Sequence, residues 1–327
     1  MLTLPRFEWA QPATVEETLA LLSDRPGETL IVAGGTDAVP NLKHRLHEPR
    51  RVVHIGRVRD LRFIREEADG FHLGPLVTLT ELSLDPGVRD AHPALARAAG
   101  LVAGPQLRNM GTLGGNLCLD TRCTYYNQTY FWREALGFCL KKDGIYCHVV
   151  PQGKRCVAAH SSDVAPVLIA LGAEVEIASR DGVRRISVDE FFVGDGVHNN
   201  VLRPQELVTR IVVPARARGM HTAYQKVRPR HAIDFPMLSV AFAARLNDSN
   251  CEEIRVVVSA LAAKPKLIGG LDPIALGRPL DGATIEAVAQ VAYKQCRPQT
   301  SVPYDPDWRH EMVPVYVRRA AREALEG

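Results

Sequence analysis

The sequence predicts an α+β protein, and two patterns indicate this fold class. Short helical and strand-like segments alternate through the first part of the chain, whereas the last part has long strand patterns followed by two amphipathic helices. Such helices have one apolar face to bury, so we expect them to cover one face of a C-terminal antiparallel sheet. The pattern changes at residues 215–219, and we predict one domain over residues 1–217 and a second over residues 218–327.

Individual elements follow from hydrophobic periodicity and turn residues. Residues 13–24 have leucines at helical spacing, and residues 29–35 predict a buried strand that ends in a glycine turn. The next helix should start at Thr36 or Asp37, and the segment SRDG predicts a hairpin turn. Further strands are expected at residues 51–56, 71–79, 173–179, 183–188 and 207–214 and within 223–246 and 252–261, and further helices at 92–104, 162–172, 283–296 and 308–325.

Composition excludes several classes of function. The net charge is only +3 and no Lys/Arg cluster has interleaved aromatic residues, which argues against a nucleic-acid partner. The chain starts without a basic segment followed by an apolar run, and no apolar run approaches the length of a transmembrane helix. We therefore expect a cytoplasmic protein. Seven cysteines in that setting favour metal ligands or redox groups over disulfides.

Two glycine turns are the first candidate binding features. The strand at residues 29–35 ends in Gly34 and Gly35, and residues 111–116 read GTLGGN. Glycine lets backbone N–H groups approach an anion without a Cβ in the way. One such turn is most often only a tight turn, but two of them could face one dinucleotide from two sides. The chain has no G-x-G-x-x-G motif of the Rossmann fold.

The segments IVAGGTD, RNMGTLGGN, SSD and YQK together resemble the FAD-binding subunits of the molybdenum hydroxylases, the family of xanthine dehydrogenase and carbon monoxide dehydrogenase. The resemblance covers nearly the whole chain. It implies an FAD-binding domain of the vanillyl-alcohol-oxidase type with two subdomains, followed by the C-terminal sheet-and-helix domain.

The resemblance also implies a set of flavin contacts. They are Ile31, Val32, Ala33, Gly34, Gly35, Thr36, Asp37, Ala38, Val102, Thr112, Leu113, Gly114, Gly115, Asn116, Asp163, Val208 and Lys226. Without the resemblance, Asp163 would be interpreted as a residue at a helix N-terminus and Lys226 as a solvated strand residue. No residue of the chain is expected to act as a catalytic acid or base.

Residues 118–158 form an insertion between the second glycine turn and the Ser-Asp pair. Four of its thiols can complete a cubane iron–sulfur cluster or a tetrahedral zinc site: Cys123, Cys139, Cys147 and Cys156. Their spacing matches no common ferredoxin or zinc-finger pattern, so spacing does not select the metal. Both ends of the insertion return to the predicted flavin site, which favours a redox-active 4Fe–4S cluster. Cys118 should pack beside the flavin, and His148 or His160 is a minor alternative ligand.

Within the family, this insertion resembles that of the 4-hydroxybenzoyl-CoA reductase branch, whose flavin subunit carries an additional 4Fe–4S cluster. The resemblance implies an oxidoreductase subunit to which ferredoxin donates electrons. They would pass through the cluster and FAD to 2Fe–2S centres on a small partner subunit and a molybdenum cofactor on a large one, in a dimer of heterotrimers. The alternative is an oxidative molybdenum hydroxylase in which the loop holds a structural zinc and docks a partner subunit.

Overall fold

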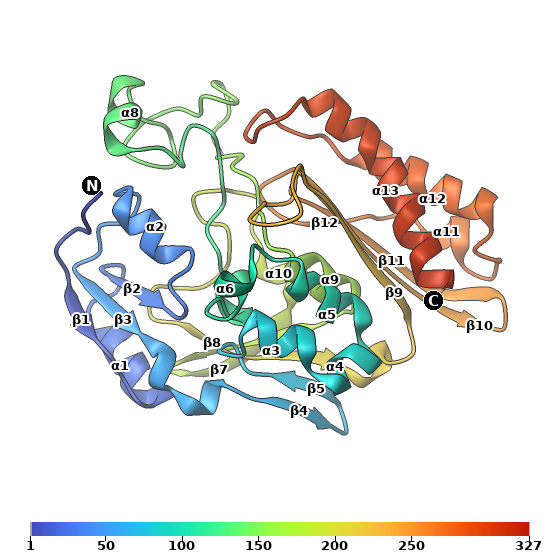
Figure 1. Ribbon diagram of the computed structural model, residues 1–327, viewed down its shortest axis with the longest axis horizontal. Coiled ribbons are helices and arrows are strands. Elements are labelled where there is room, and N and C mark those ends of the chain that lie inside the picture. Colours follow the sequence, from blue (N-terminus) through green and yellow to red (C-terminus); the bar gives the residue numbers. More distant parts are fainter. Residues whose placement is uncertain (1, 327) are drawn as a thin grey trace.

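The computed structural model describes residues 2–326, and three sheets organise this part of the chain (Figure 1). In the first sheet, parallel strands run in the order β1 (Glu8–Ala10), β3 (Arg51–His54) and β2 (Thr29–Val32). Two helices belong to this subdomain, α1 (Val15–Asp24) and α2 (Ala38–Lys43). Leu19 and Leu22 of α1 pack with Val53 of β3, so the predicted apolar face of this helix is its buried face.

The second sheet is antiparallel and forms the other half of the first domain. Its strand order is β4 (Ile64–Glu67), β5 (Gly70–Leu73), β8 (Leu207–Pro214), β6 (Glu174–Ser179) and β7 (Gly182–Ser187). The helices of this half are α3 (Leu79–Leu84), α4 (Pro86–Ala91), α5 (Pro93–Gly100), α6 (Pro105–Arg108), α7 (Leu113–Leu117), α9 (Val164–Ala170) and α10 (Val188–Phe191). Helix α9 is buried along its whole length.

The C-terminal sheet is covered on both faces. Its order is β12 (Lys266–Leu267), β11 (Asn250–Ser259), β10 (Leu238–Asn247) and β9 (His221–Val227). Its own helices are α11 (Asp272–Ala275), α12 (Gly282–Gln295) and α13 (Pro306–Glu326).

Residues of β10 alternate between two cores: Val240 and Phe242 pack with the C-terminal helices, and Ala241 and Ala243 pack in the core of the first domain. Helices α5 and α9 contact the C-terminal sheet from the first domain. The sequence predicted the helices over one face but gave no sign of what covers the other.

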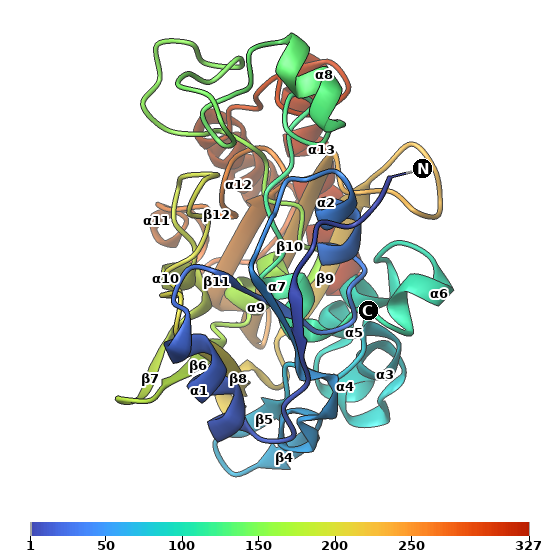
Figure 2. The ribbon, with the colours of Figure 1, turned by 90° about the vertical axis from the view of Figure 1, so that its left-hand side faces the viewer.

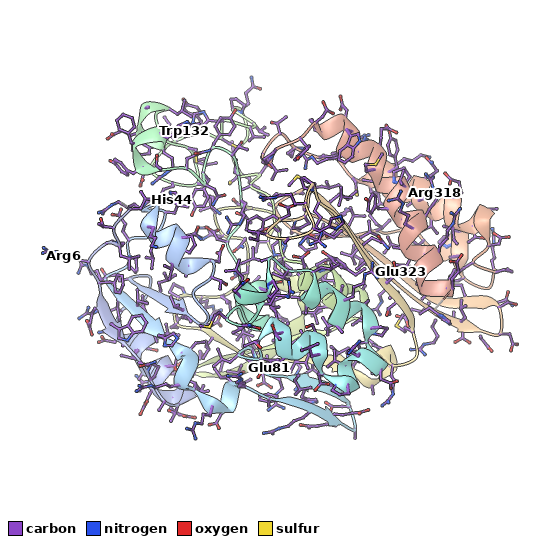
Figure 3. The ribbon with its side chains drawn as sticks, in the orientation of Figure 1. Arg6, His44, Glu81, Trp132, Arg318 and Glu323 are labelled. Atoms are coloured by element: carbon purple, nitrogen blue, oxygen red, sulfur yellow. The ribbon has the colours of Figure 1, made fainter. Side chains whose placement is uncertain are left out.

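The insertion leaves this scaffold as a long loop that projects from one end of the molecule (Figures 1 and 2). Its one helix within the described residues 119–158 is α8 (Tyr130–Ala135). Arg133 of α8 donates hydrogen bonds to the backbone oxygens of His44 at 3.3 Å and Arg45 at 3.1 Å, and Figure 3 shows Trp132 of the loop above His44. The Thr124 N–H donates to Ser301 O at 2.8 Å. The base of the loop makes further contacts with the body, because Thr121 Oγ1 donates to Gly196 O and Asn199 Nδ2 donates to Leu119 O, each at 2.8 Å.

The structure confirms most predicted elements, but a predicted strand and a predicted helix end earlier than expected. The strand expected at residues 71–79 ends at Leu73, because Thr78 and Glu81 form a capping box that starts α3 at Leu79. The helix expected at residues 92–104 ends at Gly100. Among residues 2–326 no helix is both long and apolar enough to cross a membrane.

Candidate functional site

A cavity of about 470 Å³ lies beside both glycine turns, a volume in the range of ordinary ligand sites. Its lining includes fourteen of the seventeen residues predicted to contact a flavin: Ile31, Val32, Ala33, Gly34, Gly35, Thr36, Asp37, Ala38, Val102, Thr112, Gly114, Gly115, Asn116 and Val208. The two turns and β8 thus contribute to one site although they are far apart in the sequence.

Glycine residues allow other parts of the chain to lie close to the backbone at both turns. A Cβ on Gly34 would lie 1.8 Å from the backbone oxygen of Met110, and a Cβ on Gly114 would lie 2.5 Å from the Cβ of Pro75. Gly35 has a φ of +73°, a conformation that L side chains disfavour. The second turn differs from the prediction, because it enters the short helix α7, which Thr112 caps by accepting from Gly115 N at 3.1 Å. Close approach of backbone N–H groups at two glycine turns on one cavity fits an extended dinucleotide.

Leu113, Asp163 and Lys226 lie outside this lining. Leu113 is fully buried in the core of the first domain. Lys226 Nζ lies 2.9 Å from Asp163 Oδ1, and Tyr224 Oη donates to the same carboxylate at 2.6 Å. Burial raises the pKa of Asp163, while Lys226 and Tyr224 favour its charged form. This buried pair joins the start of α9 to β9. Asp163 does stand at the N-terminus of that helix, although its side chain does not cap it, whereas Lys226 is buried and is not a solvated strand residue.

Lys226 also reaches the edge of the cavity, because its Nζ donates to the backbone oxygen of Leu101 at 3.1 Å, beside Val102. Asn116 Oδ1 accepts from Ser162 Oγ at 2.7 Å, next to Asp163. The pair therefore supports the cavity wall from behind, and a direct flavin contact by these two side chains stays a prediction.

Several cavity residues gave no signal in the sequence. Arg122 pairs with Asp37 of the first glycine turn, and its guanidinium lies 3.9 Å from the ring centroid of Phe235. Asp120 also lines the cavity. These contacts join the insertion to the glycine turn and to the C-terminal domain, across separations that local patterns do not encode.

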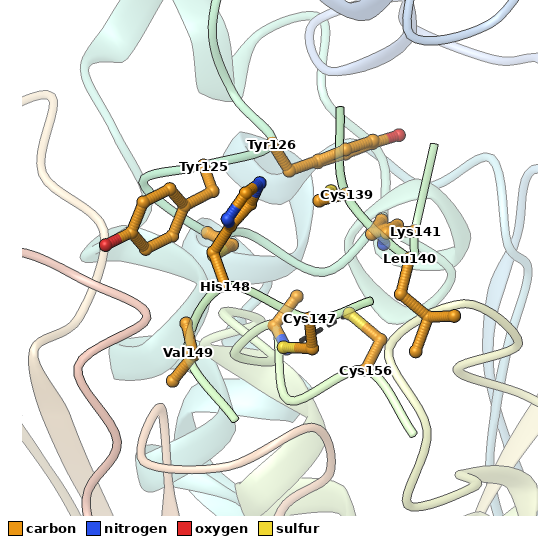
Figure 4. A pocket seen from close by; sticks show the side chains of 11 residues that line it. Tyr125, Tyr126, Cys139, Leu140, Lys141, Cys147, His148, Val149 and Cys156 are labelled. Atoms are coloured by element: carbon orange, nitrogen blue, oxygen red, sulfur yellow. Dashed lines mark hydrogen bonds between the residues drawn. The ribbon is translucent and has the colours of Figure 1, made fainter. Parts of the chain in front are cut away.

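The four predicted ligand cysteines surround one small hollow in the loop. Its lining comprises Cys123, Tyr125, Tyr126, Cys139, Leu140, Lys141, Cys147, His148, Val149, Cys156 and Ala158 (Figure 4). Cys118 lies apart from it, in the lining of the large cavity, where burial raises its pKa to about 12. His160 is fully buried, packs edge-on against Phe192 and does not line the hollow.

The positions of the four sulfur atoms bear on which metal centre the hollow could hold. Thiolates on one zinc lie about 2.3 Å from it and so about 3.8 Å from one another. Among the described residues, no three of the four sulfur atoms lie within 4.8 Å of one another. In a cubane each thiolate binds a different iron, which suits wider spacing. The hollow itself has a volume of about 10 Å³, so side chains must move outward for a cubane or inward for zinc.

Burial favours the protonated form of two of these thiols when no metal is bound. Burial raises the pKa of Cys123, and it raises the pKa of Cys156 to about 11. A bound metal would displace those protons. The backbone bridge between Arg122 and Ala159 closes the base of the loop, so the chain enters the hollow directly from the cavity lining.

A second group of potential ligands is not suited to a metal. Glu67, Asp69 and His72 lie on the β4–β5 hairpin with their ligand atoms within 4.8 Å of one another. Arg210 donates to His72 Nδ1 at 3.0 Å, so the proton of this ring is on Nε2, which donates to Asp69 at 2.7 Å. The imidazole therefore has no lone pair free for a metal.

Comparisons with known proteins agree with this geometry. Residues 5–216 match the family described as the FAD binding domain in molybdopterin dehydrogenase, and residues 222–324 match the CO dehydrogenase flavoprotein C-terminal domain. The chain is 28% identical to the carbon monoxide dehydrogenase medium chain of Hydrogenophaga pseudoflava, over 98% of this chain and 97% of that protein. It is 27% identical to the nicotine 6-hydroxylase medium subunit of Paenarthrobacter nicotinovorans, over 98% of each.

Solved structures show the same architecture. The carbon monoxide dehydrogenase structure from Hydrogenophaga pseudoflava superposes with a TM-score of 0.80 at 27% identity, covering 99% of each chain. Quinoline 2-oxidoreductase from Pseudomonas putida 86 superposes with a TM-score of 0.79 at 22% identity, covering 99% of each chain, and shares the fold.

Fold and cavity together define a flavin-binding oxidoreductase subunit with a C-terminal sheet domain. The chain belongs to the FAD-binding medium subunits of the xanthine dehydrogenase and CO dehydrogenase family of molybdenum hydroxylases. The predicted family and fold class are confirmed.

Proposed function

We propose that this chain is an electron-transfer subunit that carries FAD in the large cavity and a 4Fe–4S cluster on Cys123, Cys139, Cys147 and Cys156. The observation that carries the proposal is the gathering of four thiols around one hollow whose chain continues into the cavity lining. FAD supplies a carrier that takes up electrons singly or in pairs. The chain's own task is to hold both centres close together and away from bulk water.

In the full proposal the enzyme is a 4-hydroxybenzoyl-CoA reductase of the cytoplasm. The chain accepts single electrons from reduced ferredoxin and passes them to a small 2Fe–2S subunit and a large molybdenum subunit, in a dimer of heterotrimers. Two electrons and two protons convert 4-hydroxybenzoyl-CoA into benzoyl-CoA and water. Substrate would bind on the large subunit, so this chain needs no catalytic acid or base.

An oxidative molybdenum hydroxylase is the second candidate, and the names of the relatives favour it. Carbon monoxide dehydrogenase and nicotine 6-hydroxylase are named for oxidation of their substrates. In that case electrons would leave through the flavin, and the loop would hold zinc and dock a partner subunit. No three of the four sulfur atoms lie within 4.8 Å of one another, but the hollow must rearrange to hold either metal centre, so its geometry selects neither and does not bear on the direction of electron flow.

An anaerobic assay of the purified complex separates these functions. With reduced ferredoxin and 4-hydroxybenzoyl-CoA, the reductase forms benzoyl-CoA. A Cys139→Ser complex should keep its FAD and lose this ferredoxin-dependent activity, whereas Cys251→Ser, in the core of the C-terminal domain and outside both linings, should retain it. Absence of benzoyl-CoA from a complex that contains all its cofactors, together with zinc in the loop, would support the oxidative alternative.

A further inference from the structure

Lys141 is a buried charge between the two sites. Its side chain is 5% exposed and lines the cysteine hollow. An ammonium group has three N–H donors, and here they are directed at Asp120 Oδ1 at 2.6 Å, Thr121 Oγ1 at 2.5 Å and Gly196 O at 2.5 Å. The ammonium also lies 4.6 Å from the ring centroid of Tyr126. These contacts fix the position of the charge.

Asp120, the ion-pair partner of Lys141, lies on the side of the flavin cavity. Asp120 lines the large cavity, accepts from Tyr126 Oη at 2.7 Å and lies 3.5 Å from His47 Nε2. Asp120 is separated by only two residues from Cys123, which lines the hollow. Figure 4 shows Lys141 among the residues that line the hollow. Because Lys141 lines the hollow and Asp120 lines the large cavity, this ion pair links the two sites, with its positive member on the side of the thiols and its negative member on the side of the flavin cavity.

Fixed charges at such positions act on electron carriers. A buried charge is weakly screened, so it favours or opposes an added electron nearby more strongly than a surface charge does. A positive charge stabilises the reduced form of a centre and raises its reduction potential, and a negative charge lowers it. The orientation of this pair therefore makes a definite prediction of sign for each site.

We propose that Lys141 and Asp120 are positioning residues that set the relative reduction potentials of the two centres, Lys141 raising that of the loop centre and Asp120 lowering that of the flavin. The inference rests on the proposed function, because it needs FAD in the cavity and a redox-active centre in the loop. The ion pair between Lys141 and Asp120 also connects the lining of the hollow to the cavity wall. It therefore has a structural role as well as an electrostatic one.

The test compares four variants of the purified full chain by redox titration, following the flavin by absorbance and the cluster by electron paramagnetic resonance. Lys141→Met should shift both potentials downward, with the larger shift at the cluster. Asp120→Asn should shift both upward, with the larger shift at the flavin. Lys141→Arg keeps the charge and should restore the wild-type cluster potential. Lys142→Met is the matched control, because its side chain is 24% exposed and pairs with Asp143 at 3.2 Å, and it should change neither potential.

A purely structural role would move both potentials without this pattern of signs, or would leave them unchanged while metal content falls, and either result overturns the proposal. If Lys141→Met loses its metal, the other two variants still test the proposal. An unchanged flavin potential in Asp120→Asn would contradict it, and so would a lowered cluster potential in Lys141→Arg. A wild-type chain without a paramagnetic cluster would refute the proposed iron centre instead, and the flavin shifts would still test the Asp120 half.

Discussion

The flavin cavity and the cysteine hollow are built in opposite ways. The cavity wall is shared by β2, α7, β8 and the loops around them, so the two packed subdomains fix its position. The hollow is made by a single loop with one short helix, and its lining includes four thiols, three aromatic rings and the side chain of Lys141. Phe131 and Ile145 on this loop are 79% and 89% exposed. The fold alone can preform the first site, whereas the second depends on what it binds.

Removing a thiol should have the largest effect and should separate the two sites. Cys139→Ser takes away one of four ligands, so we expect loss of the bound metal with FAD retained. Cys118→Ser is the matched control, because Cys118 lies in the other cavity. Elemental analysis and flavin absorbance give both readouts. Four iron atoms per chain remaining in Cys139→Ser would refute the ligand assignment.

Adding a methyl group to the first glycine turn should have the opposite effect, a loss of FAD with the loop metal retained. Gly34→Ala places a Cβ 1.8 Å from Met110 O, so the two turns must part and FAD content should fall severely while the loop metal stays. Gly27→Ala is the control, since no atom lies within 4 Å of the added Cβ there, although Gly27, unlike Gly34, has a positive φ of +79°. It should cost about 1–2 kcal/mol of stability and keep its FAD. Equal FAD content in both variants would contradict the close-approach argument.

Breaking the buried ion pair behind the cavity should lower stability next most strongly. Asp163→Asn leaves the Lys226 ammonium, 1% exposed, without its counter-charge, and we expect a loss of about 3–5 kcal/mol in the free energy of unfolding. Glu286→Gln removes a pair with Arg318 whose side chains are 46% and 32% exposed, and it should cost less than about 1 kcal/mol. Denaturant unfolding measures both. Similar small losses would show that the buried pair does not support the scaffold.

The smallest expected effect is a dependence of the free energy of unfolding on pH. Burial, with a contribution from Arg218, lowers the pKa of His92 to about 4, whereas an unfolded histidine has a pKa of about 6.5. Between these values the unfolded chain binds the extra proton, so stability is lost as pH falls from 6.5 to 4, by up to about 1.4 kcal/mol per pH unit. His92→Asn should flatten that slope in urea unfolding, and an unaltered slope would count against a neutral buried ring.

Sequence patterns predicted what depends on local order. The helix at residues 13–24, the strand at 207–214 and the two C-terminal helices follow from periodicity. The end of the strand at Leu73 could also have been predicted, because Thr78 and Glu81 have the spacing of a capping box. The apolar run over residues 71–79 favoured a longer strand instead. The gathering of four cysteines could be anticipated because they share one insertion.

Long-range contacts could not be predicted in this way. Arg122 meets Asp37 across 85 positions, and Lys226 meets Asp163 across 63. Each pair depends on how sheets and helices pack, which periodicity does not specify. The second face of the C-terminal sheet was missed for the same reason, since the covering helices lie in another domain.

The central claim is that thiols of the loop hold an iron centre beside the flavin. Elemental analysis of the purified full chain, with electron paramagnetic resonance after reduction, tests it most directly. The account predicts four iron atoms and one FAD per chain, with a paramagnetic signal that disappears in Cys139→Ser. One zinc per chain, with no iron and no signal, would contradict it.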